Sequence, residues 1–190
     1  MPLSVEPLEI PAVRLITPVR HEDDRGFFSE AWNRRAWAEA GLDIDFVQDN
    51  HALSREAGTV RGLHFQAPPY QQDKLVRVLR GAILDIALDL RSGSPSYGKH
   101  VSVKLSAGDG KLLLVPVGFA HGLVTLEPNT ELLYKVSGFF AKSHDFGLLW
   151  NDPALGIDWG ISEDDAILSE KDQRQPSLAE LPDYFDYAES

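Results

Sequence analysis

The sequence predicts an all-β protein, built as a sandwich or barrel of short strands. Most of the chain alternates between apolar and polar side chains with a period of two, which is the pattern of half-buried strands. Glycine, proline, asparagine and serine separate these runs as turn residues. Helical periodicity is sparse. Many short, evenly spaced strands with few helices are typical of a β-sandwich or β-barrel.

Seven runs along the chain have this strand pattern. The run 75–91 shows it best, because Leu84, Ile86 and Leu88 fall on one face while Asp85 and Asp89 fall on the other. The seven predicted runs, in chain order, are 11–19, 43–54, 58–66, 75–91, 99–109, 111–126 and 130–140.

Two short segments have helical patterns. Residues 33–41 predict about two turns that end at Gly41, and residues 162–172 predict a short helix with Ser162 as its N-cap and acidic residues in its first turn. The acidic, proline-containing tail from about residue 176 is expected to pack over the surface or to fray. Since no repeat or linker interrupts the chain, we predict one domain over residues 1–190.

The composition limits the classes of function. Eighteen lysines and arginines against 29 acidic residues give a net charge of −11, which disfavours binding to nucleic acid or to anionic membranes. The chain has no cysteine, so disulfides and thiolate metal sites are excluded. No apolar run approaches the roughly 20 residues that a bilayer requires, and the N-terminus lacks the pattern of a signal peptide. We therefore expect a cytoplasmic protein.

His64 is the first candidate for chemistry. A lone histidine on a strand is more often a packed core residue than a catalyst. Lys74, His121 and Tyr134 follow it, however, so the chain offers a base, a cation and a phenol. This set suits proton transfer at a carbon beside a carbonyl. The histidine would remove the proton, Lys74 would stabilise the enolate oxygen, and Tyr134 could return a proton on the opposite face.

A metal centre is the alternative for two histidines in a β-barrel. Such centres usually take a second histidine two residues after the first, with a carboxylate nearby. Here that position is Gln66, and no carboxylate precedes Asp73. We therefore expect no metal.

An anionic ligand would need a local group of basic residues, given the acidic chain as a whole. The segment DRGFFSE is of interest here, because Arg25 and Glu30 flank a Gly-Phe-Phe run that would make a stacking or strand-pairing surface. A plain edge strand is the alternative for this segment. The candidate anion-binding residues are Arg25, Arg61, Lys74, Arg77 and Lys171.

Several segments together resemble one known family, that of the dTDP-4-dehydrorhamnose 3,5-epimerases. The similarity runs from about residue 10 to residue 181, and several independent motifs in one order are more specific than any single motif. The matching segments are DRGFFSE, FVQDNHALS, GTVRGLHFQ, DKLVRVLRGAILDIALDLR, PSYGKHVSVKLS, VPVGFAHGLVTL, LLYK, WNDPALGIDW and LSEKDQRQPSL.

The resemblance implies a cupin-type double-stranded β-helix, or jelly roll, that needs neither metal nor cofactor. It implies a homodimer in which N-terminal strands extend into the partner. It also implies four catalytic residues. His64 would remove protons beside a 4-keto group with Asp172 as its partner, Tyr134 would be the proton donor, and Lys74 would lie near the sugar oxygen or enolate.

The resemblance implies substrate-binding residues as well. Phe140 falls where better-known members have a tyrosine that stacks on thymine, with Phe139 as the alternative. Arg61 and His64 would point to opposite faces of a regular strand, so we expect a bulge or twist at Gly62. The implied binding residues are Arg25, Phe28 and Glu30, reaching the neighbouring subunit's nucleotide, and Gln48, Asp49, Asn50, Arg61, His121, Phe140, Asp145 and Lys171.

The activity implied by the resemblance is conversion of dTDP-4-dehydro-6-deoxy-D-glucose to dTDP-4-dehydro-L-rhamnose by inversion at C3 and C5. One alternative is a mono-epimerase acting at C3 or C5 of a related nucleotide deoxysugar, in antibiotic or surface-polysaccharide synthesis. Another is a non-catalytic cupin that only binds a sugar nucleotide. The preferred nucleotide base stays open.

Overall fold

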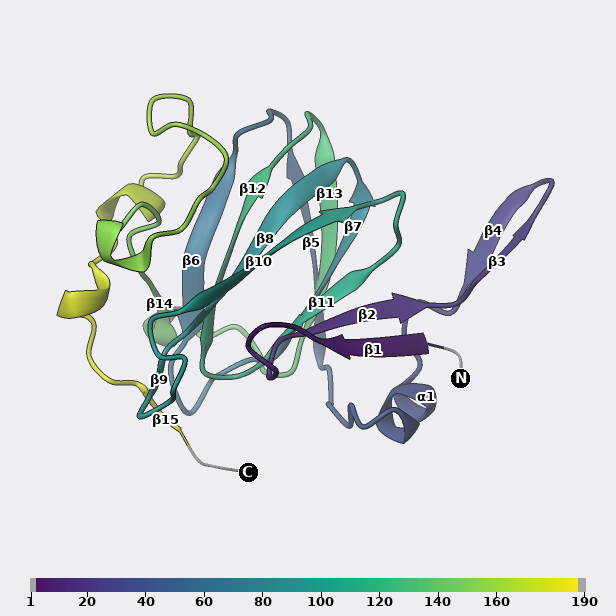
Figure 1. The fold of residues 1–190 in the computed structure, drawn as a ribbon, viewed down its shortest axis with the longest axis horizontal. Helices are drawn as coiled ribbons and strands as arrows, with labels where there is room; N and C mark the ends of the chain where they lie inside the picture. Colours follow the sequence, from purple (N-terminus) through teal and green to yellow (C-terminus); the bar gives the residue numbers. More distant parts are fainter. Residues whose placement is uncertain (1–2, 188–190) are drawn as a thin grey trace.

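Two antiparallel β-sheets face each other in the computed structural model, which describes residues 3–187 (Figure 1). This arrangement confirms the predicted all-β class and the cupin-type jelly roll. The six-stranded sheet has the spatial order β1 (Leu3–Pro7), β2 (Arg14–Pro18), β11 (Leu112–Val115), β7 (Lys74–Arg80), β13 (Thr130–Val136) and β5 (Gln48–Ser54). The five-stranded sheet has the order β10 (His100–Ser106), β8 (Ala82–Asp89), β12 (Phe119–Thr125), β6 (Val60–Gln66) and β14 (Asp145–Gly147).

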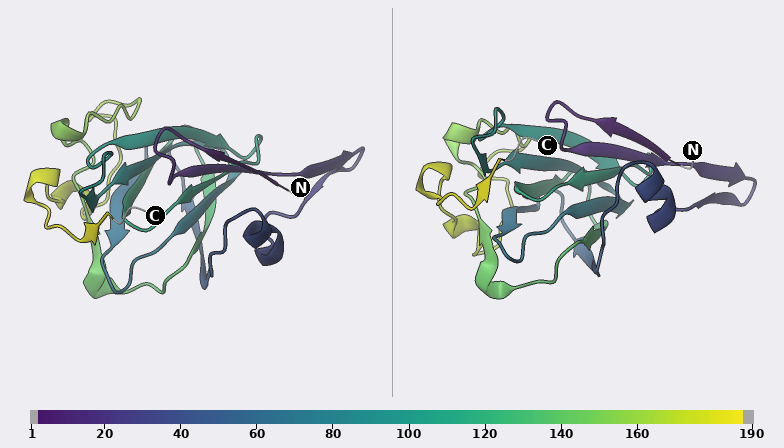
Figure 2. Two further views of the ribbon diagram at one scale, coloured as in Figure 1. Left: turned by 60° about the horizontal axis from the view of Figure 1, so that its bottom comes forward. Right: turned by 90° about the horizontal axis from the view of Figure 1, so that it is seen from below.

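The remaining elements lie outside the two sheets. A hairpin of β3 (Arg20–Asp23) and β4 (Gly26–Ser29) projects away from the sandwich (Figure 2), and β9 (Arg91–Ser92) pairs in parallel with β15 (Phe185–Asp186). The helix α1 covers Arg34–Glu39. No helix among residues 3–187 is both long and apolar enough to cross a membrane. The four 3-10 turns are η1 (Lys142–His144), η2 (Pro153–Leu155), η3 (Asp172–Arg174) and η4 (Leu178–Glu180).

Each of the seven predicted strand runs contains at least one observed strand. The predicted helix at 33–41 is confirmed as α1, where the Asn33 side chain accepts hydrogen bonds from the backbone of Arg35 and Ala36. The short strands β1, β14 and β15 were not predicted, because a few residues show no recognisable alternation.

The predicted helix at 162–172 is wrong. Ser162 does accept a hydrogen bond from the backbone of Asp165, but only one turn follows. Ile167 then forms an isolated parallel bridge with Thr59, and its backbone bonds to Gly58 and Val60. These bonds to the start of β6 take the place of helical ones, so the segment is extended where it meets the sheet.

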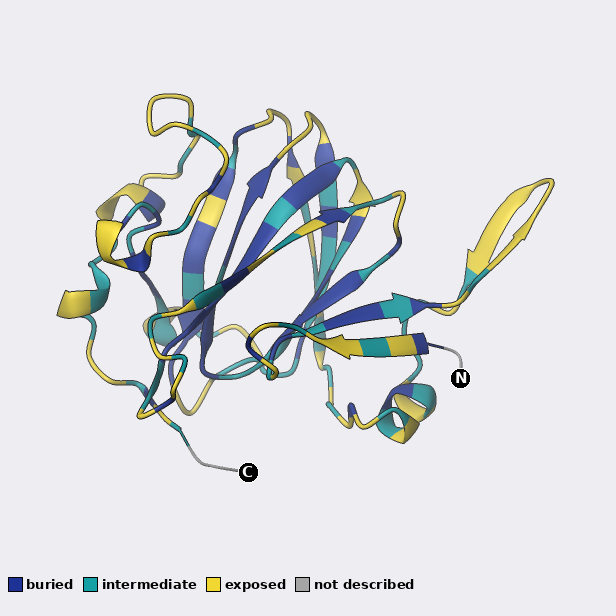
Figure 3. Ribbon diagram, viewed as in Figure 1, coloured by how far each residue is buried: buried dark blue, intermediate teal, exposed yellow. Residues whose placement is uncertain are grey.

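Both faces of β8 are buried, so the alternation of its apolar and polar residues does not separate a core face from a solvent face (Figure 3). Ile83 and Ala87 belong to the core between the two sheets, whereas Ile86 and Leu88 pack under the C-terminal segments with Trp150 and Trp159. The acidic side chains of β8 therefore point into the sandwich. Asp85 and Asp89 are both 0% exposed.

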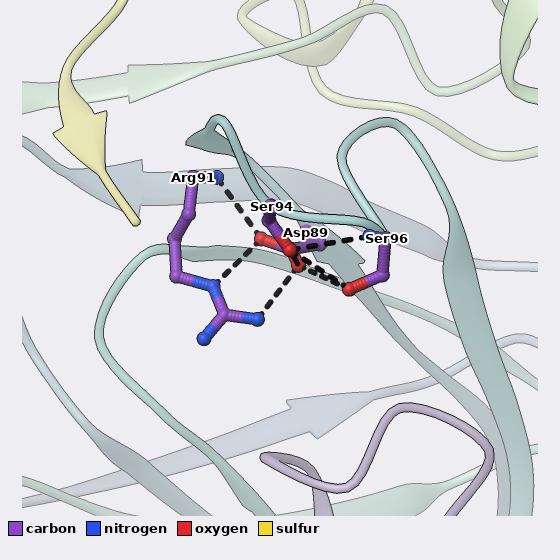
Figure 4. A network of polar contacts seen from close by, with 4 residues as sticks. All are labelled: Asp89, Arg91, Ser94 and Ser96. Atoms are coloured by element: carbon purple, nitrogen blue, oxygen red, sulfur yellow. Dashed lines mark hydrogen bonds and ion pairs between the residues drawn. The ribbon is translucent and has the colours of Figure 1, made fainter. Parts of the chain in front are cut away.

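Asp89 is neutralised by a local network (Figure 4). Arg91 makes two side-chain hydrogen bonds to its carboxylate, and the hydroxyls of Ser94 and Ser96 donate to Oδ2 at 2.7 and 2.6 Å. The Arg91 guanidinium also lies over the rings of Phe119 and Tyr187. The network thereby fastens the C-terminal segment 185–187 to the sandwich, so this part of the predicted acidic tail packs and does not fray.

The expected irregularity at Gly62 is present. In the pairing of β6 with β12, His64 lies opposite His121 and Arg61 lies opposite Leu123, so β6 has one more residue than β12 across this interval. Such a bulge reverses the facing of residues on either side of it. Gly62 has φ +129°, and a Cβ there would meet Gly122 Cα and His121 O. The strand can approach β12 this closely only because Gly62 has no side chain.

We expect Gly62→Ala to lower the free energy of unfolding by about 3 kcal/mol or more, because the added methyl group enters the backbone of β12 at a φ that only glycine adopts readily. Urea denaturation measures this loss. Gly93→Ala is the matched control, since Gly93 has φ +84° with nothing within 4 Å of a Cβ. The control should lose about 1 kcal/mol. Equal losses in both variants would show that crowding against β12 is not the cause.

Candidate active site

A cavity lies between the two sheets and has two adjoining parts of about 300 and 240 Å³. His64, Lys74 and Tyr134 line both parts. Lys74 and Tyr134 come from β7 and β13 of the six-stranded sheet, whereas His64 comes from β6 of the five-stranded sheet. The two sheets thus present a base from one side of the cavity and a cation and a phenol from the other.

His64 is paired with a buried carboxylate. Its Nε2 lies 2.5 Å from Oδ1 of Asp172, whose side chain is 4% exposed. The hydroxyl of Ser169 donates to the second carboxylate oxygen at 2.8 Å. Burial acts to raise the pKa of Asp172, but the hydrogen bond and charge of His64, together with Ser169 and Lys171, hold that pKa below its usual range. An ionised Asp172 accepts a hydrogen bond from Nε2–H, which leaves Nδ1 of the neutral ring as the free base.

Lys74 supplies a cation beside this histidine. Its Nζ donates to the backbone carbonyl of His64 at 3.2 Å. Burial lowers the pKa of Lys74 to about 8, although the charges of Asp145 and Asp85 act in the opposite direction. The amine is therefore mostly protonated at neutral pH, and it can stabilise negative charge that develops on a ligand oxygen.

Tyr134 keeps its proton at neutral pH. Burial raises the pKa of its phenol, an effect that the positive charge of Arg61 partly offsets. The side chain is positioned by β13, which pairs with β7 so that Tyr134 lies opposite Val76. A protonated phenol that faces His64 across the cavity can act as a general acid.

A second histidine–carboxylate pair lies next to the first. His121 is the cross-strand neighbour of His64, and its Nε2 lies 2.5 Å from Oδ1 of Asp85. The sequence pattern did not mark Asp85 as a site residue, because the period-two alternation showed only that it lies on the polar face of β8. Its signal was present, since a carboxylate between apolar neighbours in a central strand must have a partner if it is buried.

Arg61 and Lys171 provide positive charge at the cavity. The bulge at Gly62 brings Arg61 to the same side as His64, where its guanidinium donates to Ser54 Oγ and to the Leu53 carbonyl. Lys171 Nζ lies 2.5 Å from Asp145 Oδ2, and both residues line the larger part.

Gln48 and Asn50 line the larger part from β5, at the edge of the six-stranded sheet. The Gln48 amide donates to Asn50 Oδ1 at 2.8 Å, and its oxygen accepts from the backbone of Phe140 at 3.4 Å. Phe140 is 59% exposed at the cavity. Phe139 does not line it, so Phe140 is the better placed of the two phenylalanines for stacking on a flat ligand group.

Four of the expected binding residues do not line the cavity of their own chain. Asp49 alternates with Gln48 and Asn50 on β5, so it points to the outer face, where it contacts Lys135 Nζ at 2.8 Å. The other three are Arg25, Phe28 and Glu30, which belong to the projecting hairpin or to the chain that follows it.

Two glutamines hold the loop that carries Phe140. Buried Gln66 donates to the carbonyls of Tyr70 and Phe139 and accepts from the backbone of Ala141. Gln72 donates to the Gly138 carbonyl at 2.6 Å. Their role as supports depends on contacts across the fold, so the sequence pattern gave no sign of it.

Within residues 3–187, no group of three or more histidine and acidic side chains is arranged to hold a metal ion. Each of the two histidines in the cavity wall has its Nε2 committed to a carboxylate.

This chain is similar to known proteins along nearly its whole length. A family model described as dTDP-4-dehydrorhamnose 3,5-epimerase matches residues 7–180. The dTDP-4-dehydrorhamnose 3,5-epimerase of Sinorhizobium fredii is 51% identical over 180 residues, which cover 95% of this chain and 92% of the relative.

Solved structures agree with this relationship. The dTDP-6-deoxy-D-glucose-3,5-epimerase of Legionella pneumophila, in complex with dTDP-4-keto-L-rhamnose, superposes with a TM-score of 0.93 at 34% identity, covering 98% of this chain and 100% of the other. The dTDP-4-dehydrorhamnose 3,5-epimerase of Bacillus anthracis, with TDP and pyrophosphate bound, has a TM-score of 0.89 at 44% identity, covering 92% of this chain and 99% of the other. Sequence and fold therefore agree along nearly the full length, and the chain belongs to the dTDP-4-dehydrorhamnose 3,5-epimerase family.

Proposed function

We propose that this chain is an isomerase that converts dTDP-4-dehydro-6-deoxy-D-glucose to dTDP-4-dehydro-L-rhamnose by inverting C3 and C5. The observation that carries this proposal is the hydrogen-bonded pair of His64 and Asp172 in a cavity that Lys74 and Tyr134 enter from the facing sheet. The Legionella relative, which has the same fold, holds dTDP-4-keto-L-rhamnose.

The first step is removal of a proton from a carbon beside the 4-keto group. Nδ1 of His64 accepts the proton, and the electron pair of the broken C–H bond moves to the C4 oxygen as an enolate. Asp172 stabilises the imidazolium that results, and Lys74 stabilises the enolate oxygen. C3 and C5 both flank the carbonyl, so one base and one cation serve both carbons.

The second step returns a proton to the other face of the sugar ring. Tyr134 donates it from the opposite sheet, and the enolate collapses to the ketone with inverted configuration. The donor and the base must lie on opposite sides of the substrate for inversion, and the facing sheets provide that separation. The phenolate then recovers a proton from solvent, and the His64 imidazolium releases its proton to solvent, which restores the starting enzyme.

The nucleotide end of the substrate has candidate partners along the same cavity. Arg61 and Lys171 suit the diphosphate, and Phe140 offers a ring on which a base can stack. Gln48, Asn50, His121 and Asp145 complete the polar wall. Phe140 has no hydroxyl, so it cannot recognise the base by a hydrogen bond. A preference for thymine therefore needs other contacts.

We propose that the active form is a homodimer of single-domain chains. The N-terminal hairpin of each chain extends to the cavity of its partner. The hairpin has few contacts with its own sandwich, and its Phe27 and Phe28 are 54% and 70% exposed. Exposed aromatic residues on a projecting strand pair are typical of a surface that another chain covers. The residues that would then reach the partner's cavity are Arg25, Phe28 and Glu30. Asp49 stays on the outer face of the six-stranded sheet.

The parent protein should exchange the protons at C3 and C5 of dTDP-4-dehydro-6-deoxy-D-glucose with deuterated water, as followed by proton NMR. His64→Asn should slow exchange at both carbons by about 100-fold or more, because the base is lost. His100→Asn is the control, since His100 lies on β10 and does not line the cavity. Exchange at one carbon alone in the parent would indicate a mono-epimerase, and no exchange would indicate a protein that only binds the sugar nucleotide.

Tyr134→Phe should separate exchange from inversion. The base remains, so deuterium still enters at the carbon that His64 attacks, while formation of the inverted sugar falls about 100-fold because the opposite-face donor is gone. Tyr97→Phe, a change outside the cavity, should leave both rates unchanged. Inversion at the parent rate in Tyr134→Phe would remove that residue from the mechanism.

Complementation tests the exchanged hairpin. Arg25→Ala and His64→Asn homodimers should each have little activity. When the two chains are co-expressed, about a quarter of all sites combine an intact hairpin with an intact cavity, so about a quarter of the parent activity should return. Co-expressed His64→Asn and Tyr134→Phe should recover none, since both defects lie in the cavity. No recovery in the first mixture would mean that each hairpin serves its own chain.

A further inference from the structure

Asp85 is a buried carboxylate whose charge has little local compensation. Its side chain is 0% exposed, and Oδ1 contacts His121 Nε2 at 2.5 Å. Oδ2 is also buried and has no hydrogen-bond partner among residues 3–187. Asp89, four residues further along the same face of β8, differs sharply, because Arg91, Ser94 and Ser96 all contact its carboxylate (Figure 4).

A buried carboxylate with an unpartnered oxygen destabilises the fold relative to an apolar side chain of similar size. The neighbours of Asp85 on the same face of β8, Ile83 and Ala87, are apolar core residues, so packing alone would favour an apolar residue at this position. The charge therefore has to act on a group nearby.

The charge of Asp85 acts on two groups, and both line the cavity. His121 is bonded to it directly and stands beside His64 in the pairing of β12 with β6. Lys74 enters the same part of the cavity from β7 on the facing sheet. Asp85 itself does not line the cavity, and its buried side chain contacts the histidine that does.

We propose that Asp85 is a positioning residue of the active site, which fixes the His121 ring in the cavity wall and supplies the buried negative charge that balances Lys74. This role rests on the proposed epimerase function. The Nε2–H of His121 donates a hydrogen bond to Asp85, so its Nδ1 is the ring nitrogen available to a sugar hydroxyl. Lys74 keeps its proton and can stabilise the enolate.

Several charged or titratable groups face Lys74, and they do not all act in one direction. Asp145 on β14 and Asp85 on β8 favour its protonated form, whereas burial and the charge of Lys171 oppose it. The other titratable groups of the cavity wall are Arg61 and His64 on β6, His121 on β12, Tyr134 on β13, and Asp172 of η3.

The two carboxylates that support Lys74 differ in what else they hold. Asp145 is engaged by Lys171 at 2.5 Å, so part of its negative charge is already balanced. Asp85 has no lysine or arginine bonded to it among the described residues. Removing its charge should therefore make the pKa of Lys74 fall further below its ordinary value, where burial already holds it at about 8.

The first test is titration of Lys74 by NMR in full-length protein labelled with ¹³C-lysine, with Lys74→Arg used to assign the signal. We expect a midpoint near pH 8 in the parent. In Asp85→Asn the midpoint should move to lower pH by about 0.5 or more. Asp89→Asn is the matched control, since it neutralises another buried carboxylate of β8 that does not act on Lys74. An unchanged Lys74 midpoint in Asp85→Asn, or an equal change in Asp89→Asn, would overturn the proposal.

The same variants should differ in the pH dependence of kcat/KM. Activity of the parent should fall as the pH rises through about 8, where Lys74 loses its proton. In Asp85→Asn this fall should begin at lower pH, so a midpoint lowered by about 0.5 should cost about twofold relative to the parent at pH 8 and less at pH 6.5. A loss that is uniform across this range would indicate a structural role and overturn the proposal.

A measurement on the parent alone covers the case in which Asp85→Asn fails to fold. The ring ¹⁵N shifts of His121 should show a proton on Nε2, the nitrogen that contacts Asp85, in the absence of any substrate. A ring protonated only at Nδ1 would mean that Asp85 carries the proton, and the proposal would be wrong. The two NMR measurements need no turnover, so an inactive parent would contradict the proposed function without deciding the role of Asp85.

Discussion

The close pairing of β6 with β12 at Gly62 is the constraint on which the rest of the site depends. One extra residue in β6 turns Arg61 to the side of the strand that His64 occupies, and it leaves His64 directly opposite His121. A regular strand would have separated Arg61 and His64 on two faces. The absence of a side chain at Gly62 permits this arrangement, because β12 backbone fills the space that a Cβ would need.

The C-terminal third of the chain completes what the strands begin. Asp172 reaches His64 from 108 residues away in the sequence, and Ser169 in the same segment holds its second oxygen. Behind β6 and β14, the aromatic rings of Phe65, Phe146 and Tyr184 pack together. The outer layer therefore has two effects. It buries the back of the five-stranded sheet, and it supplies the carboxylate that contacts His64.

Charge in the cavity is arranged differently from charge in the chain as a whole. The protein carries a net charge of −11, yet Arg61, Lys74 and Lys171 gather where an anionic ligand would lie. Carboxylates balance this local excess: Asp172 is paired with His64, Asp85 with His121, and Asp145 with Lys171. Each carboxylate thereby has a cationic or hydrogen-bonding partner inside the protein.

The sequence by itself determined the longer strands, the fold class and the residue types of the site, because alternation and turn residues are local signals and the motifs keep their order along the chain. It did not determine the conformation of residues 162–172. These residues have a helical pattern, but their backbone forms hydrogen bonds with the start of β6 instead of helical ones. It also gave Asp85 no role. A period of two shows which residues share a face of a strand, but only the packing of both sheets and the C-terminal layer decides which face looks inward. For β8 both faces are buried, and the face with the carboxylates is the one that points into the sandwich.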